Sequence, residues 1–209
     1  MLIKICGCRE PEDARAAIAA GADAVGMIFV PGARRRVGRA EAHRLVSAVA
    51  GDVLTVGVFA DQMPAEILDV ASDVGLDAIQ LHGTRDEGVA EGLGSRFLLL
   101  RAWSVGAPVP AVGDWILAEG RGPGGSGQSW DWSQASGLGA RLGRPILLAG
   151  GLTPENVADV IAVAQPDAVD VSTGVETQGR KDPERILAFC EAVRGCGHGQ
   201  GRYAGWRAR

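Results

Sequence analysis

Cysteine and net charge are both scarce in this chain. Its four cysteines are Cys6, Cys8, Cys190 and Cys196, and they have neither the paired CxxC spacing of a zinc site nor the density of a disulfide scaffold. We therefore expect reduced thiols and a cytoplasmic location. The 21 basic and 25 acidic residues give a net charge of −4, which offers no general attraction to nucleic acid or to an anionic membrane. Any anionic ligand would have to be held by local donors.

Long apolar runs are also missing. No stretch reaches the roughly 18 apolar residues of a membrane span, and no charged start followed by an apolar run resembles a signal peptide. We therefore expect a soluble protein with no membrane or nucleic-acid partner. The 209 residues suit one domain with a sizeable core. A (βα)8 barrel of roughly 200 to 250 residues would fit that length.

Short strand-like runs alternate with helical stripes along most of the chain. The runs cover residues 2–7, 24–29, 54–59, 78–81, 97–103, 115–118, 145–149 and 168–172. Between most of them lie apolar residues at helical spacing, although the Pro- and Gly-rich connection after residue 103 predicts a short or absent helix. After the seventh run, Thr153 is a good helix N-cap and Pro154 a good first helical residue.

This alternation predicts an α/β protein, a single-domain (βα)8 TIM barrel over residues 1–194. Eight strands favour a closed barrel over an open doubly wound sheet. Residues 195–209 are rich in glycine and arginine without periodicity, which predicts a flexible tail.

The first strand carries two reactive side chains. Lys4 and Cys6 are two residues apart, so they share a face near the C-terminal end of the strand, where barrel active sites lie. Cys6 is a candidate acid or base, and the alternative is a small buried apolar residue. A base would need the thiolate, which is scarce because the ordinary pKa is about 8.5. Lys4 would lower that pKa unless its side chain fills the barrel instead.

Two glycine-containing turns follow the last two strands. Gly150-Gly151 and Ser172-Thr173-Gly174 would be neighbours in a barrel, where backbone N–H groups and a helix N-terminus favour a phosphate. Each turn alone is ordinary, but the pair together predicts a phosphate site.

Three more positions carry polar groups at the same end of the predicted barrel. Asp170 interrupts an apolar strand, where a carboxylate is costly unless it is paired or used. Arg34, Arg35 and Arg36 form either a solvated charged run or a site in which one guanidinium binds a carboxylate or phosphate. His82 is either a substrate contact or a rim histidine with protein partners.

Six segments occur in a characteristic order. They are Lys4–Gly7, Gly57–Phe59, Gln80–Gly83, Gly124–Gly127 with Trp130–Trp132, Leu148–Val157 and Val169–Glu176. In this order they closely resemble the phosphoribosylanthranilate isomerases of tryptophan biosynthesis, over about residues 2–194. The resemblance implies a (βα)8 barrel that converts N-(5-phosphoribosyl)anthranilate into 1-(2-carboxyphenylamino)-1-deoxyribulose 5-phosphate. The implied reaction is an acid/base Amadori rearrangement of a small-molecule phosphoribosyl substrate without cofactor or metal, by a monomer or a homodimer.

The resemblance also implies roles for individual residues. Cys6 matches the catalytic base, Arg35 the contact to the anthranilate carboxylate, and Asp170 a group that assists at the sugar. The substrate-binding residues expected in this way are Lys4, Arg35, His82, Gly125, Gly150, Gly151, Ser172, Thr173 and Gly174.

One position departs from the family pattern. The family's general acid is an aspartate that ends the sixth strand in a Leu-Leu-Asp motif, whereas here Ile116-Leu117 is followed by Ala118, which has no proton to donate. Glu119 could serve as the acid if the strand bends, because adjacent residues of a regular strand point to opposite sides. Otherwise the alanine is an engineered change or the activity has been lost.

Three hypotheses remain from the sequence. The first is an active isomerase with Cys6, Glu119 and Asp170 as catalytic residues. The second is a catalytically impaired barrel that binds phosphoribosyl ligands, in which case Ala118→Asp would restore activity. The third is the related sugar-phosphate isomerase of histidine biosynthesis, but that enzyme class has an aspartate at the end of the first strand, where this chain has Cys6.

Overall fold

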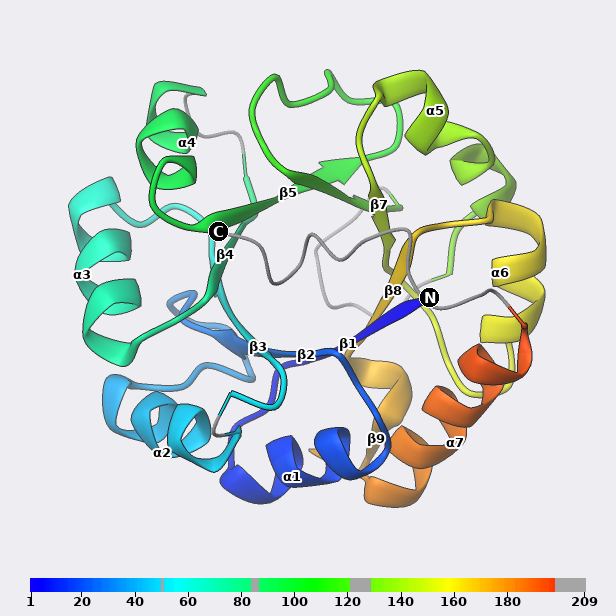
Figure 1. The fold of residues 1–209 in the computed structure, drawn as a ribbon, viewed down its shortest axis with the longest axis horizontal. Coiled ribbons are helices and arrows are strands. Elements are labelled where there is room, and N and C mark those ends of the chain that lie inside the picture. The colour runs from blue at the N-terminus through cyan, green and yellow to red at the C-terminus, as the bar shows by residue number, and fades with distance from the viewer. Residues whose placement is uncertain (50, 84–86, 121–128, 198–209) are drawn as a thin grey trace.

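Eight parallel strands close into a barrel in chain order, each hydrogen-bonded to the next and β1 to β8. The computed structural model describes residues 1–49, 51–83, 87–120 and 129–197. Figure 1 looks along the barrel and shows the helices as an outer ring around the strands. The strands are β1 Leu2–Cys6, β2 Ala24–Ile28, β3 Leu54–Phe59, β4 Ala78–Leu81, β5 Leu98–Ser104, β6 Trp115–Glu119, β7 Ile146–Leu148 and β8 Ala168–Val171.

Capping residues and prolines mark the ends of several helices. Asp182 caps the last helix by accepting hydrogen bonds from the backbone of Glu184 and Arg185, and Pro183 occupies its first turn. The helices are α1 Pro11–Ala19, α2 Arg39–Val49, α3 Pro64–Val74, α4 Glu87–Gly94, α5 Leu138–Leu142, α6 Val157–Ala164 and α7 Pro183–Gly195. Short 3-10 turns cover η1 Trp132–Ala135 and η2 Thr173–Val175, and a hairpin joins β9 Glu176–Thr177 to β10 Arg180–Lys181.

Alternation along each strand divides the core in two. One set of side chains packs between the strands and the helices, and on β6 it includes Ile116 and Ala118. The other set fills the barrel interior, and on β6 it includes Trp115 and Leu117. Residues that continue the inward series beyond the apolar layers therefore reach the C-terminal mouth of the barrel.

The predicted barrel and its eight strands are confirmed, while several boundaries differ. No helix forms over residues 105–114, as expected for the connection after β5. The helix after β7 begins at Val157 and not at Pro154, because the Asn156 side chain bonds to the backbone of Thr153 and Gly151 and holds a turn there first.

The last helix, α7, includes Gly195, the first residue of the predicted tail. Most of the predicted tail lies outside the described residues, so the proposed division at residue 194 stays a prediction. Among the described helices, none combines the length and apolar character that crossing a membrane requires.

Candidate active site

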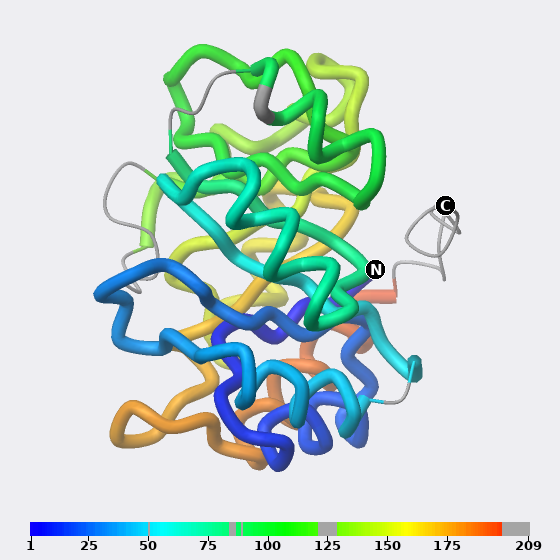
Figure 2. Tube along the Cα trace, turned by 90° about the vertical axis from the view of Figure 1, so that its left-hand side faces the viewer, coloured from blue at the N-terminus to red at the C-terminus, as the bar shows by residue number. Residues whose placement is uncertain are grey.

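A cavity of about 680 Å³ opens at the C-terminal ends of the strands. In the side view of Figure 2, the loop after β2 (blue) and the segment after β8 (orange) extend on the left, opposite the N-terminus. Most of the predicted site residues line this cavity: Cys6, Arg35, His82, Glu119, Gly150, Gly151, Asp170, Ser172, Thr173 and Gly174. Gly125 lies outside the described residues. Gln80, which was not predicted as a site residue, lines the cavity as well.

Lys4 lies in the barrel interior and pairs with Asp170. The two residues are register partners on β1 and β8, and Lys4 Nζ is 2.8 Å from Asp170 Oδ1. Burial by itself would lower the pKa of the Lys4 ammonium, but the charges of Asp170 and Cys6 outweigh burial and raise it. Lys4 is completely buried and is not part of the cavity lining, so the structure places it as a support for Asp170 and Cys6.

Cys6 lies at the cavity floor beside this pair. Gly26 on β2 leaves space for it, because a Cβ there would lie 2.9 Å from Cys6 Sγ and 3.1 Å from Lys4 Nζ. Burial raises the pKa of the Cys6 thiol, and the nearby Lys4 and Lys181 oppose this only in part. Lys4 therefore acts on this pKa in the expected direction, and its side chain also fills the barrel interior, which was the alternative.

Cys8 provides a contrast two residues along the chain. It packs in the outer core and its thiol donates to the backbone carbonyl of Ile5, with Sγ 3.7 Å from the oxygen. Burial raises the pKa of Cys8 to about 12. Of the two thiols, only that of Cys6 faces the cavity.

Glu119 faces the cavity without any bend in β6. The strand runs regularly against β5 through Glu119, and Leu117 and Glu119 both line the cavity. Ala118 points the other way and is fully buried in the outer core. The expectation that β6 must bend before Glu119 can reach the site is therefore wrong, because regular strand alternation turns Glu119 inward and Ala118 outward.

A chain of polar side chains leads from β4 to Glu119. Gln80 Nε2 lies 2.7 Å from His82 Nε2, and His82 Nδ1 lies 3.5 Å from Glu119 Oε1. Gln80 is almost completely buried, and its Oε1 has no hydrogen-bond partner among the described residues.

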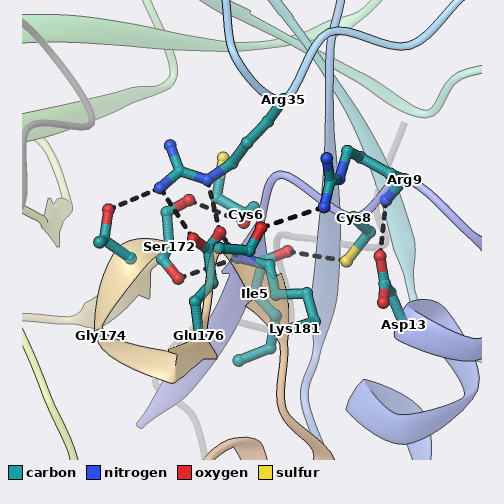
Figure 3. A network of polar contacts seen from close by, with 12 residues as sticks. Ile5, Cys6, Cys8, Arg9, Asp13, Arg35, Ser172, Gly174, Glu176 and Lys181 are labelled. Atoms are coloured by element: carbon teal, nitrogen blue, oxygen red, sulfur yellow. Dashed lines mark hydrogen bonds and ion pairs between the residues drawn. The ribbon is translucent and has the colours of Figure 1, made fainter.

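Arg35 is held against the loop after β8 by Glu176, as Figure 3 shows. Its Nε lies 2.5 Å from Glu176 Oε1 and its Nη2 lies 2.7 Å from Thr173 Oγ1. Glu176 also contacts Arg34 at 2.5 Å and Lys181 at 3.1 Å. Hydrogen bonds from both arginines and the charge of Lys181 overcome the effect of burial and lower the pKa of Glu176 to about 2.

Glu176 was not predicted as a site residue, although it stands in the last of the six motif segments. The signal that could have identified it is an acid at the end of the turn after the eighth strand, at the same end of the barrel as the run of arginines after the second strand. One of the three arginines, Arg35, is buried at the cavity, which confirms that the run is not wholly a solvated charged face.

The two glycine turns meet as predicted. Gly150 and Gly151 adopt φ of +91° and +69°, which favours glycine. Gly174 packs so closely on the loop after β7 that a Cβ there would lie 1.9 Å from the carbonyl oxygen of Leu152. The segment after β8 is a three-residue 3-10 turn and not the start of a longer helix, so Ser172, Thr173 and Gly174 line the cavity from a tight turn.

Comparison with known proteins identifies relatives over nearly the whole chain. The family profile described as N-(5'phosphoribosyl)anthranilate (PRA) isomerase matches residues 3–192. The N-(5'-phosphoribosyl)anthranilate isomerase of Desulforudis audaxviator is 41% identical over 205 residues, covering 92% of this chain and 98% of that protein. The phosphoribosyl anthranilate isomerase of Thermus thermophilus has a similar structure, with a TM-score of 0.86 and 35% identity, covering 93% of this chain and 99% of that one.

Two further solved relatives add information about ligands and assembly. One is a phosphoribosyl anthranilate isomerase in complex with reduced 1-(o-carboxyphenylamino)-1-deoxyribulose 5-phosphate, with a TM-score of 0.78 and 36% identity over 93% of this chain and all of that one. The other is a monomeric form generated from the dimeric enzyme of Thermotoga maritima, with a TM-score of 0.78 and 35% identity over the same shares. The profile match and the near-complete alignments show that this chain belongs to the N-(5'-phosphoribosyl)anthranilate isomerase family.

Proposed function

We propose that this chain isomerises N-(5-phosphoribosyl)anthranilate to 1-(2-carboxyphenylamino)-1-deoxyribulose 5-phosphate in tryptophan biosynthesis. One observation carries the proposal: a thiol, Cys6, and a carboxyl group, Glu119, face the same cavity from β1 and β6. Such a pair suits a reaction that needs one proton donor and one proton acceptor on the same small substrate.

Glu119 acts as the general acid. It donates a proton to the furanose ring oxygen as the bond between that oxygen and C1' breaks, which leaves an open-chain Schiff base. Its position supports this role, because Glu119 lines the cavity and its side chain is mostly shielded from solvent, with 15% exposed.

Cys6 acts as the general base. Its thiolate removes the C2' proton to give an enolamine, which then tautomerises to the ketone. Burial favours the neutral thiol, so the thiolate depends on the Lys4 ammonium, which lowers the pKa of Cys6 through its charge and a hydrogen bond. Asp170 keeps Lys4 charged and presents its own carboxylate to the sugar.

The remaining groups bind the two anionic ends of the substrate. The turns at Gly150–Gly151 and Ser172–Gly174 hold the phosphate, with Gly125 as a further contact, and Arg35 holds the anthranilate carboxylate. Arg35 uses Nε and Nη2 for protein contacts, so Nη1 is the group offered to the ligand. The expected small-molecule partner, a cytoplasmic location, and a monomeric or homodimeric state belong to the same proposal.

The alternative hypothesis, a catalytically impaired barrel that only binds phosphoribosyl ligands, is no longer supported. It was motivated by Ala118, which lies in the outer core and not at the site. Glu119 offers a carboxyl group to the cavity, which supports an intact general acid.

The test compares Cys6→Ala with Cys8→Ala. Phosphoribosylanthranilate is fluorescent, so its consumption can be followed directly. We expect Cys6→Ala to lower kcat at least about 10²-fold, the contribution of a positioned base. Cys8→Ala, which changes a buried thiol in the outer core, should keep kcat close to that of the unmodified protein. Full activity of Cys6→Ala would refute the role of Cys6.

A further inference from the structure

Three inward-facing side chains connect β4 to β6 across the cavity. Gln80 and His82 follow one another on the inner face of β4 and its extension, and Glu119 ends β6. β5 lies between them, and its inward residue at this level, Ala102, is small. The imidazole can therefore extend over β5 towards the carboxyl group.

The contact with Gln80 determines which nitrogen of His82 carries the proton. The structure places the amide nitrogen of Gln80, which is a donor, 2.7 Å from His82 Nε2, and with the amide in this orientation Nε2 accepts. A neutral imidazole then carries its proton on Nδ1, the atom that faces Glu119 Oε1. The separation of 3.5 Å is long for a hydrogen bond, and catalytic contacts of this kind shorten when substrate binds.

We propose that Gln80 and His82 position Glu119 for proton donation, an inference that rests on the proposed role of Glu119 as general acid. When Oε1 accepts from His82 Nδ1–H, Oε2 becomes the oxygen that carries the proton. After transfer, the same Nδ1–H stabilises the carboxylate that is left. His82 therefore acts through Glu119 and not as a direct ligand of the substrate, since both of its ring nitrogens face protein groups.

Gln80 also has a free acceptor for the substrate. Its Oε1 is buried and has no partner among the described residues, and an unsatisfied buried acceptor destabilises the protein. A leucine or methionine would fill the barrel at this level without that cost. A hydroxyl or N–H group of the bound substrate would satisfy Oε1 and fix the amide, so that substrate binding also fixes the tautomer of His82.

The tautomer can be measured in the intact protein without any turnover. The chain has three histidines, so ¹⁵N spectra of the imidazole rings can be assigned with His82→Asn and the exposed His43→Gln. We expect His82 to be protonated on Nδ1 in the unmodified protein. In Gln80→Met the ring should move towards the Nε2-protonated form. A ring protonated only on Nε2 in the unmodified protein would overturn the proposal.

Two substitutions of His82 separate positioning from simple packing. The side-chain amide of Asn lies near the place of Nδ1 and can still donate to Glu119, whereas that of Gln lies near Nε2 and cannot. We expect His82→Asn to keep kcat within about fivefold and His82→Gln to lower it about 20-fold or more, a part of the effect of a general acid. KM, and the Kd for reduced 1-(o-carboxyphenylamino)-1-deoxyribulose 5-phosphate, should change less than about threefold in both.

Controls distinguish failure of this inference from failure of the proposed function. An unmodified protein that does not consume phosphoribosylanthranilate would refute the function, and an active Glu119→Gln would refute the acid. If the unmodified protein is active and Glu119→Gln is not, equal losses in His82→Asn and His82→Gln would overturn the positioning role alone. If the His82 variants changed KM and left kcat unaltered, the positioning role would also be overturned. His43→Gln should behave like the unmodified protein.

Discussion

The Glu176 cluster makes the stability of this protein depend on pH in a predictable way. Burial opposes ionisation of Glu176, but Arg35, Arg34 and Lys181 lower its pKa from 4.5 to about 2. At about 1.36 kcal/mol for each pKa unit, this difference corresponds to about 3 kcal/mol of folding free energy. Because the folded state lowers the pKa, this stability is complete above about pH 4.5 and is lost as the pH falls towards 2.

The perturbation that isolates this contribution is Glu176→Gln. Urea unfolding at a series of pH values between 7 and 2 should give a free-energy difference between the two proteins that shrinks by about 3 kcal/mol on acidification. Glu12→Gln is the matched control, because Glu12 is 71% exposed in its pair with Arg15 and should shift stability by less than about 1 kcal/mol. A difference between Glu176→Gln and the unmodified protein that is the same at every pH would refute the reasoning.

Three further predictions concern single side chains of the barrel. Ala118→Asp would place an unpaired carboxylate in the outer core, so we expect a loss of about 3–5 kcal/mol in urea unfolding and no gain in kcat; a stable, more active variant would contradict this. Gly174→Ala should force the loops after β7 and β8 apart and lower kcat/KM about 10²-fold, whereas Gly195→Ala, with open space around it, should be neutral or slightly stabilising. Asp170→Asn would leave Lys4 buried without its carboxylate and should cost about 3–5 kcal/mol in the same unfolding assay; unchanged stability would show that the pair contributes little.

The barrel could be predicted from sequence because its signals are local and repeated. Each strand is a short apolar run, and each helix shows one buried stripe, so errors at single boundaries do not change the order of elements. The helix after β7 shows the limit: Thr153 and Pro154 have the composition of a helix start, yet the Asn156 side chain binds the preceding backbone and delays the helix to Val157.

Site residues could be predicted from the sequence only where the residue type is itself unusual for its position in a strand or turn. Cys6, Asp170 and the glycine turns are unusual for their positions, so the sequence predicts them as site residues, and in the structure they line one cavity. The sequence could not decide between Ala118 and Glu119, because their directions depend on the inward phase of β6, and the structure shows that Glu119 faces the cavity and Ala118 the outer core. Gln80 and Glu176 depend on contacts between strands far apart in sequence, which no local pattern contains.

The ion pair between Lys4 and Asp170 connects the first strand of the barrel to the last. Lys4 lies on the first strand of the barrel, and its counter-charge is supplied 166 positions later by the last strand. Until that strand has emerged, the Lys4 ammonium has no carboxylate partner and the thiol of Cys6 stands at an unclosed edge. In truncated or nascent chains that stop before β8, we therefore expect Cys6 to be present but unable to act as the catalytic base.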